Sequence, residues 1–234
     1  MYDQHIVLDF EMNPVAEENK DCRAHFYSEI IEIGAVKLND RYEAADKFSC
    51  LVKPQLNDRI EQPIIRLTGI TSADVGMSIT FERALTAFSR WIGEGRTRIY
   101  SWGERDLADL KTECAVKNIA FPENMKRWMN FQPIYYRLMR ADSRKRCISL
   151  ERAAQWFGMT MDEDKAHRAL YDAKVTARLV RSVLTGEYLK QVETLNKELN
   201  DRRELKVSMG DVCADAFAKL LEQLAADETN ENEE

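Results

Sequence analysis

The sequence predicts an α/β fold in which a mixed sheet is covered by helices. Alternating and β-branched residues dominate three early segments, whereas apolar residues spaced three or four apart recur from residue 81 onward, with one short strand among them. Strands first, followed by strand and helix in alternation, are typical of a mixed sheet with helices on its faces. The 234 residues, 44% of them hydrophobic, are enough for one sizeable domain with its own core.

Three early segments are predicted to be strands in meander order. Residues 5–11 form a short apolar run, residues 29–38 carry alternation and β-branched side chains, and a third strand surrounds residues 48–52. The polar stretch 13–25 lacks clear periodicity and is predicted to be a loop. A further short strand is predicted at 97–102.

The helices are predicted from their apolar spacing. The first runs from Phe81 to Ile92, and Gly93 and Gly95 end it. The last has small residues along one face, which indicates close packing on another element. The same spacing predicts helices at residues 104–117, 131–140, 149–157 and 166–184.

The composition changes after residue 186, so we expect the folded domain to span residues 1–186. Residues 187–226 contain two amphipathic, highly charged stretches and are predicted to form a helical extension. Packing on its own domain is favoured, because an amphipathic helix more often covers its own core, but a homo-oligomer or protein partner remains an alternative. The acidic residues 227–234 are predicted to be disordered.

Composition excludes several classes of protein. A net charge of -6 argues against a surface that is cationic throughout, although a protein that binds nucleic acid needs only a local basic path. The N-terminus has no basic region before a long apolar core, and no stretch approaches 18 apolar residues, so we expect a soluble, cytoplasmic protein without membrane contact. The five cysteines lack metal-binding spacing and are predicted to be reduced: Cys22, Cys50, Cys114, Cys147 and Cys213.

Asp9 and Glu11 are the first candidate site residues. Because side chains alternate along a strand, both would lie on one face of the predicted strand 5–11. A buried pair of like charges is tolerated chiefly when a cation neutralises it, and oxygen ligands favour magnesium or manganese. Two exposed charges at a strand end explain the pair equally well.

Asp106, His167 and Asp172 are further candidates. Asp106 lies near a helix start, where a carboxylate also interacts with the helix dipole, and spacing does not choose between it and its neighbours Glu104 and Asp109. Five residues are about 500° of helical rotation, so His167 and Asp172 cannot share a helix face. We expect the histidine on the entry loop, where it could reach a water or be only a surface or capping residue, and Asp172 inside the helix.

Several motifs in order carry a resemblance to a known family: VLDFE, EIIEIGAVKLN, LVKP, IIRLTGITSADV, YSWGERDLADLKTEC, SLERAAQWFGM and AHRALYDAKVTARL. Over residues 4–184 the chain resembles the DEDDh-type 3′-to-5′ exonucleases of the ribonuclease H-like superfamily. It is most similar to the branch containing the histone-mRNA 3′ exonuclease and its bacterial relatives. The resemblance implies a mixed five-stranded sheet flanked by helices.

The resemblance also implies roles for the candidates. Asp9, Glu11, Asp106 and Asp172 would be acidic ligands of two divalent cations, Mg²⁺ or Mn²⁺, and His167 would be the general base. Trp-Gly-x-x-Asp selects Asp106 over its neighbours. The implied substrate is a free 3′ end of single-stranded RNA or DNA, with RNA favoured through the branch, and the products are nucleoside 5′-monophosphates.

The resemblance suggests where the terminal nucleotide would bind. Many relatives have Thr or Ser soon after the first motif, where this chain has Met12, Asn13 and Pro14, so its contacts to the 3′-hydroxyl are open. Core packing explains Leu67 and Ile70 about as well, and Trp102 better. The expected substrate-binding residues are Phe10, Met12, Asn13, Leu67, Thr68, Ile70 and Trp102.

A basic cluster at residues 137–146 could hold the phosphate backbone, although a solvated loop is at least as good an explanation. The cluster comprises Arg137, Arg140, Arg144, Lys145 and Arg146.

Two rival functions stay open. One is a nucleic-acid-binding or adaptor module without catalysis, against which the presence of all five catalytic residue types counts. The other is an oligoribonuclease-like dimer, which substrate length would separate.

Overall fold

The computed structural model describes residues 2–19, 23, 25–139, 148–162, 165–194 and 197. The chain divides into two compact units, Met1–Tyr188 and Leu189–Glu234. The first unit contains every strand and helix discussed below. The predicted extension at 187–226 and tail at 227–234 fall largely outside the described residues, so both stay predictions.

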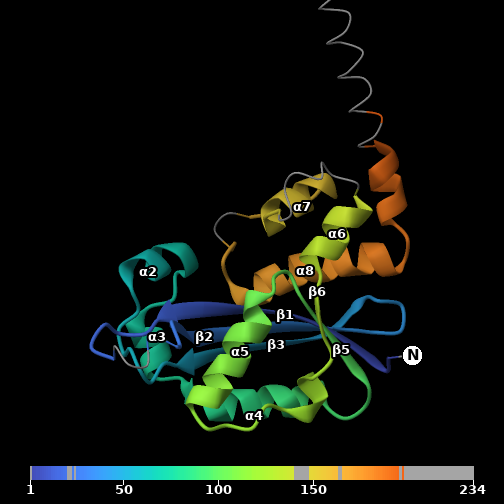
Figure 1. The fold of residues 1–234 in the computed structure, drawn as a ribbon. Coiled ribbons are helices and arrows are strands. Elements are labelled where there is room, and N and C mark those ends of the chain that lie inside the picture. The colour runs from blue at the N-terminus through green and yellow to red at the C-terminus, as the bar shows by residue number, and fades with distance from the viewer. Residues whose placement is uncertain are drawn as a thin grey trace, which may run out of the picture. The chain divides into compact units, whose positions relative to one another are not determined.

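The sheet has six strands in the order β4-β3-β2-β1-β5-β6 (Figure 1). β1, β2 and β3 pair antiparallel in the predicted meander, whereas β5 and β6 continue parallel to β1. The predicted mixed sheet is therefore confirmed. The strands are β1 (Gln4–Pro14), β2 (Ser28–Leu38), β3 (Ala44–Lys53), β4 (Ile79–Thr80), β5 (Thr97–Ser101) and β6 (Trp128–Asn130).

The strand count is six rather than the expected five. β4 has only two residues, which pair with Val52 and Lys53 at the edge of β3, and β6 has only three. Strands this short carry no alternation by which a sequence could reveal them. β1 also runs beyond the predicted residue 11 to Pro14, because pairing with β2 resumes after a register shift between Glu11 and Met12.

Helices cover both faces of the sheet (Figure 1). α4 and α5 lie on one face, and α8 lies on the other with α6 and α7 beyond it. Each of these five helices lies inside a predicted segment, whereas α2 and α3 occupy a stretch left unassigned. The bounds are α2 (Gln62–Thr68), α3 (Ser72–Gly76), α4 (Phe81–Ile92), α5 (Arg105–Val116), α6 (Gln132–Leu138), α7 (Leu150–Trp156) and α8 (Ala169–Leu184).

Within the described part of the chain, no helix combines the length and the apolar character needed to span a bilayer. Cys50 and Cys114 are free thiols, as predicted. Cys22, Cys147 and Cys213 lie outside the described residues.

The alternation of β1 separates core from site. Ile6, Leu8 and Phe10 point into the main hydrophobic core, where they pack with residues of α4 and α5. Asp9 and Glu11 consequently point to the opposite face, on which α8 packs. The strand thus places two carboxylates beneath α8 while its apolar side chains stabilise the sheet from the other side.

Gly34 of β2 allows α8 to approach the sheet closely. A Cβ at this position would lie 2.0 Å from the backbone nitrogen of Leu170 and 2.1 Å from the carbonyl carbon of Ala169. Gly34 pairs with Asp9 in the β1–β2 register. The missing side chain therefore brings the first turn of α8 directly over the site strand.

Candidate active site

Three carboxylates from two elements converge. Asp9 and Glu11 come from β1, and Asp172 comes from the first turn of α8. One ligand oxygen from each lies within 4.8 Å of the others. Period-2 alternation places the first two on one face, and the close packing of α8 brings in the third.

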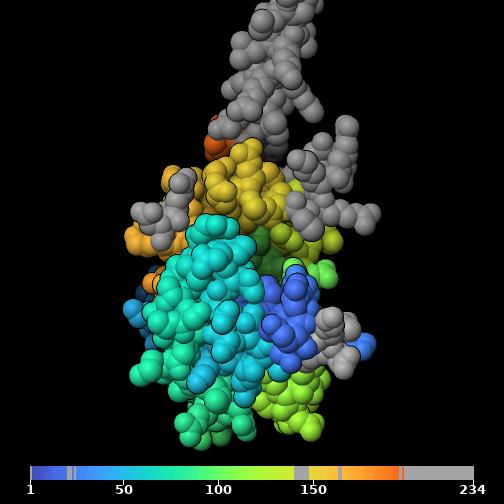
Figure 2. Space-filling view, turned by 90° about the vertical axis from the view of Figure 1, so that its left-hand side faces the viewer, coloured from blue at the N-terminus to red at the C-terminus, as the bar shows by residue number. Residues whose placement is uncertain are grey.

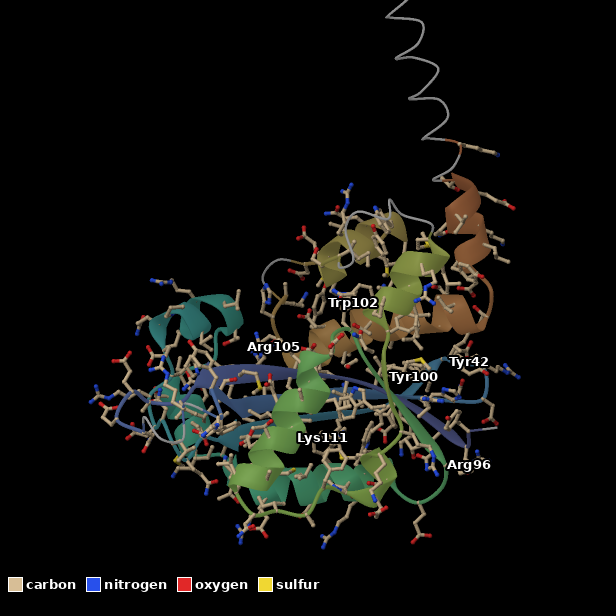
Figure 3. The ribbon with its side chains drawn as sticks, viewed as in Figure 1. Tyr42, Arg96, Tyr100, Trp102, Arg105 and Lys111 are labelled. Atoms are coloured by element: carbon tan, nitrogen blue, oxygen red, sulfur yellow. The ribbon has the colours of Figure 1, made fainter. Side chains whose placement is uncertain are left out.

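Asp106 lies beside this group, in the first turn of α5. Burial is the largest cause of the raised pKa of Asp9, and the charge of Asp106 is the next largest. Backbone N–H groups of Asp106 itself and of Phe10 oppose the rise in the pKa of Asp106. Its neighbour Asp109 pairs instead with Arg105 at 3.7 Å. Figure 3 shows Arg105 and Trp102 where the chain passes from β5 into α5.

Burial raises the pKa values of all four carboxyl groups, and repulsion by the other site carboxylates adds to the rise for Asp9 and Glu11. The pKa of Asp9 rises well above its usual range, chiefly through burial and then through the charges of Asp106 and Glu11. Burial is also the largest cause for the others, raising the pKa of Glu11 to about 9, that of Asp106 to about 7 and that of Asp172 to about 6. Asp9 and Glu11 therefore favour the protonated state unless a cation offsets their charge.

The donor set fits divalent cations. All four side chains offer oxygen ligands, which suit Mg²⁺ or Mn²⁺. The Oδ1 atom of Asp172 is buried and lacks a hydrogen-bond partner among the described residues. A buried carboxylate oxygen without a partner is costly unless a cation binds it.

His167 lies on the loop that enters α8, as expected, and its side chain is exposed. Its backbone φ is +60°, in the left-handed region, which histidine adopts more readily than bulkier residues. The backbone N–H of His167 donates to Oδ2 of Asp172 at 3.3 Å. The structure therefore brings His167 next to the carboxylate group while leaving its ring accessible to solvent.

Glu32 and Arg168 belong to this region and were not predicted. Glu32 is buried, and its carboxylate accepts hydrogen bonds from Nε and Nη2 of Arg168, at 3.2 and 2.8 Å. Glu32 also raises the pKa values of Asp9 and Glu11. An acidic residue inside the apolar run EIIEIG was the available signal, because such a strand position is rarely charged without a partner.

Several expected substrate-binding residues are buried. Phe10 lies in the core at 7% exposure, and Ile70 packs in a second apolar cluster with Ile31 and Val75. Trp102 is 8% exposed, and its indole N–H donates to the carbonyl of Ile148 at 3.1 Å. These contacts give all three a packing role that requires no nucleotide, and their contact with substrate stays a prediction.

The segment around α2 contains the exposed candidate. Leu67 is 48% exposed, whereas the buried Thr68 hydroxyl donates to the Ile64 carbonyl and accepts from the Ile70 N–H. Figure 2 shows a hollow on this side of the molecule, between α7 in yellow and the cyan segment that includes α2. Leu67 is thus an exposed apolar side chain of this segment.

Asn13 connects β1 to the chain that leads into α2. Its buried amide donates to the Arg59 carbonyl at 3.0 Å and accepts from the Glu61 N–H at 2.9 Å. Met12, one residue earlier, is partly buried against the main core. Asn13 therefore positions the neighbouring segment.

Of the basic cluster, Arg137 is exposed on α6, and the other four cations lie outside the described residues.

A mixed sheet with four carboxylates from β1, α5 and α8, and one histidine from the loop that enters α8, defines a ribonuclease H-like nuclease fold. The family model described as "Exonuclease", RNase_T, matches residues 6–180. The chain belongs to this exonuclease family.

Relatives of known description agree. The 3′-5′ exoribonuclease 1 of Rattus norvegicus is 31% identical over 219 residues, covering 88% of this chain and 59% of the relative. The probable 3′-5′ exonuclease KapD of Bacillus subtilis is 28% identical, covering 76% and 83%. The chain spans about three-fifths of the length of the rat relative.

A solved structure shows the same fold. It is the nuclease domain of 3′hExo, a DEDDh family member bound to rAMP. The TM-score is 0.68 at 27% identity, with 79% of this chain and 93% of that chain covered. A second, described as recognising the 3′ end of a histone mRNA stem-loop, gives a TM-score of 0.69 at 26% identity, covering 79% and 83%. The resemblance to the DEDDh exonucleases and their histone-mRNA branch is confirmed.

Proposed function

We propose that this protein is a metal-dependent 3′-to-5′ exonuclease that releases nucleoside 5′-monophosphates from single-stranded nucleic acid. The observation that carries the proposal is the convergence of Asp9, Glu11 and Asp172, whose oxygens lie within 4.8 Å of one another. Asp106 stands close enough for its charge to act on Asp9. Four carboxylates in one place are unfavourable for the apo fold, so their cost is explained best by a function that needs them.

Asp9, Glu11, Asp106 and Asp172 would hold two divalent cations, Mg²⁺ or Mn²⁺. When bound, such cations acidify a coordinated water and stabilise the negative charge on the attacked phosphate and on the leaving oxygen. The carboxylates themselves fix where this chemistry occurs, because they lie on the strand β1 and on the first turns of α5 and α8 rather than on long loops.

His167 would act as the general base. Its ring is exposed on the loop beside Asp172, so it can take a proton from a water at the site and pass it to solvent. Imidazole groups ordinarily titrate near neutrality, which suits repeated proton transfer.

RNA is the favoured substrate. The support comes from relatives described as exoribonucleases and from a similar structure bound to rAMP. Leu67 on α2 offers an exposed apolar surface on which a terminal base can pack. We propose the cytoplasm as the working compartment, since the free thiols of Cys50 and Cys114 suit a reducing environment.

The deciding experiment uses oligomers of RNA and DNA labelled at the 3′ or the 5′ end, with Mg²⁺, Mn²⁺ or a chelator. We expect metal-dependent loss of one nucleotide at a time from the 3′ end, with RNA degraded faster. Asp9→Ala and His167→Ala should lower kcat by at least about a hundredfold. Glu104→Gln is the matched control, because Glu104 is an exposed acidic residue two positions from Asp106, and it should keep full activity.

Each rival function predicts a different outcome. Binding of labelled RNA without any metal-dependent shortening would overturn the enzyme and favour an adaptor. Rapid degradation of oligomers shorter than about five nucleotides, with longer ones spared, would favour the oligoribonuclease-like alternative. Activity that survives in Asp9→Ala would show that the metal site is elsewhere.

A further inference from the structure

Two residues of β2 stand directly opposite the two site residues of β1. Glu32 pairs with Glu11, and Gly34 pairs with Asp9 in the antiparallel register. Paired residues in antiparallel strands point to the same face of the sheet, here the face covered by α8. Where β2 contacts the start of α8, Gly34 leaves room for the helix backbone and Glu32 provides a buried carboxylate.

Glu32 accepts hydrogen bonds from the two residues that follow His167. Its Oε1 accepts from Nη2 of Arg168 at 2.8 Å, and its Oε2 accepts from Nε of Arg168 at 3.2 Å and from the backbone N–H of Ala169 at 3.0 Å. The Glu32 side chain is 2% exposed and that of Arg168 is 45% exposed. Ala169 is the first residue of α8, so Glu32 supplies from β2 an acceptor for a free N–H of that helix start.

These contacts constrain a backbone conformation that a non-glycine residue seldom adopts. His167 has φ +60°, and its own N–H makes only a long hydrogen bond, 3.3 Å, to Oδ2 of Asp172. A strained backbone conformation of this kind persists only when several surrounding contacts hold it in place. The residues immediately after His167 provide that restraint through their three hydrogen bonds to Glu32.

We propose that Glu32, through Arg168 and Ala169, is the positioning residue that fixes the His167 loop beside the carboxylates. Glu32 acts on the reaction only through His167, so the inference rests on the proposed function. Its role differs from that of a fifth metal ligand, because both of its oxygens are engaged by N–H donors. The bidentate, charge-assisted geometry gives the loop a defined orientation as well as an attachment.

The kinetic test compares Glu32→Gln with Glu113→Gln. Glu113 is an equally buried acid that also accepts one backbone N–H, from Ile30, and one cation, Lys117, but it lies on α5. We expect Glu32→Gln to lower kcat on labelled RNA by about tenfold to a hundredfold, with KM and Mn²⁺ affinity each within about threefold of wild type. Glu113→Gln should retain kcat within about threefold.

Two kinetic outcomes would overturn the proposal. One is an unchanged kcat in Glu32→Gln. The other is a loss of activity that is fully restored by raising the Mn²⁺ concentration, which would make Glu32 part of the metal site instead.

A spectroscopic test works without activity. The chain contains only three histidines, so ring signals from histidine-labelled protein can be assigned to His167 through the His167→Ala variant. We expect Glu32→Gln to shift or broaden the His167 signal while those of His5 and His25 stay unchanged. If Glu32→Gln does not fold, Arg168→Lys keeps the charge but loses the two-point contact, and it should move the same signal.

An unmoved His167 signal in a folded variant would contradict the positioning role. Absence of nuclease activity in the wild type would overturn the proposed function instead. The two failures are thus distinguishable.

Discussion

Glu11 of β1 and Glu32 of β2 are direct partners across the sheet, yet their carboxylates have opposite environments. Glu32 is paired with Arg168, whereas burial and then the charges of Asp172 and Glu32 raise the pKa of Glu11 to about 9, although Arg168 opposes the rise. Like charges directly opposite each other destabilise a sheet. Arg168 neutralises Glu32 through this ion pair, whereas the charge of Glu11 is left to a proton or a metal ion.

Replacing Glu11 should therefore stabilise the metal-free protein. The folded-state pKa of Glu11, about 9, lies above its ordinary value of 4.5. The stability that protonated Glu11 contributes is fully present below about pH 4.5 and is lost as pH rises toward 9. We expect Glu11→Gln to raise the free energy of unfolding of the apo protein by roughly 1–3 kcal/mol at pH 8 and to leave it nearly unchanged at pH 4.5.

Denaturation in a chelating buffer at the two pH values checks this expectation. The same variant should lose nuclease activity by about a hundredfold or more, since it lacks a proposed ligand. Glu104→Gln, which changes an exposed acid outside the converging group, is the control. A Glu11→Gln protein that is less stable than wild type at pH 8 would contradict the prediction.

Metal should stabilise the protein increasingly as pH rises. The pKa values of Asp106 and Asp172 rise to about 7 and about 6, so protons compete with a cation below neutrality. At a Mn²⁺ concentration 100 times its Kd, binding contributes about 2.7 kcal/mol, or about 5–10 °C in Tm for a domain of this size. We expect such a shift at pH 8 and little shift at pH 5.5, measured by thermal melts with and without Mn²⁺.

Asp9→Asn should lose most of the metal-dependent shift at pH 8 while folding normally. A Tm shift of the same size at both pH values, or in the variant, would indicate that Mn²⁺ binds at another place.

Gly34→Ala should disrupt the site without altering any candidate catalytic residue. The added methyl would meet backbone atoms of Ala169 and Leu170 at 2.0–2.5 Å, and backbone cannot move aside as a flexible side chain can. We expect a loss of about 2–4 kcal/mol in stability and a large fall in Mn²⁺ affinity, because Asp172 moves with α8. Denaturation and Mn²⁺ titration measure the two effects.

Gly76→Ala is the matched control, because a Cβ there would point into open space among the described residues. It should match wild type in both measurements. Equal behaviour of the two variants would mean that α8 does not depend on its close approach to β2.

The sequence predicted the parts of the fold that have long, regular patterns. α4, α5 and α8 are amphipathic over three or more turns, and the alternation of β1 and β2 is clear, so local periodicity was sufficient. β4, β6, α2 and α3 are too short to show a period. Their formation depends on contacts with distant segments, such as the pairing of β4 with the end of β3.

The site was predictable to the extent that its residues follow local rules. Alternation placed Asp9 and Glu11 together, and helical rotation placed His167 off the helix of Asp172. Spacing alone did not separate Asp106 from Asp109, because only the folded chain shows that the charge of Asp106 acts on Asp9. Glu32 was missed because its partners are set by β-strand register and by the packing of α8, which are tertiary properties.

Leu67→Ala tests whether the α2 segment contacts the substrate. Leu67 is 48% exposed, so its removal should change stability by less than about 0.5 kcal/mol. If a terminal base packs on it, KM for labelled RNA should rise about threefold to tenfold with kcat nearly constant, because the lost contact binds ground state and transition state alike. Met77→Ala, which removes a 93% exposed side chain that follows α3, is the control and should leave KM unchanged. Equal KM values for the two variants and the wild type would show that the nucleotide binds without Leu67.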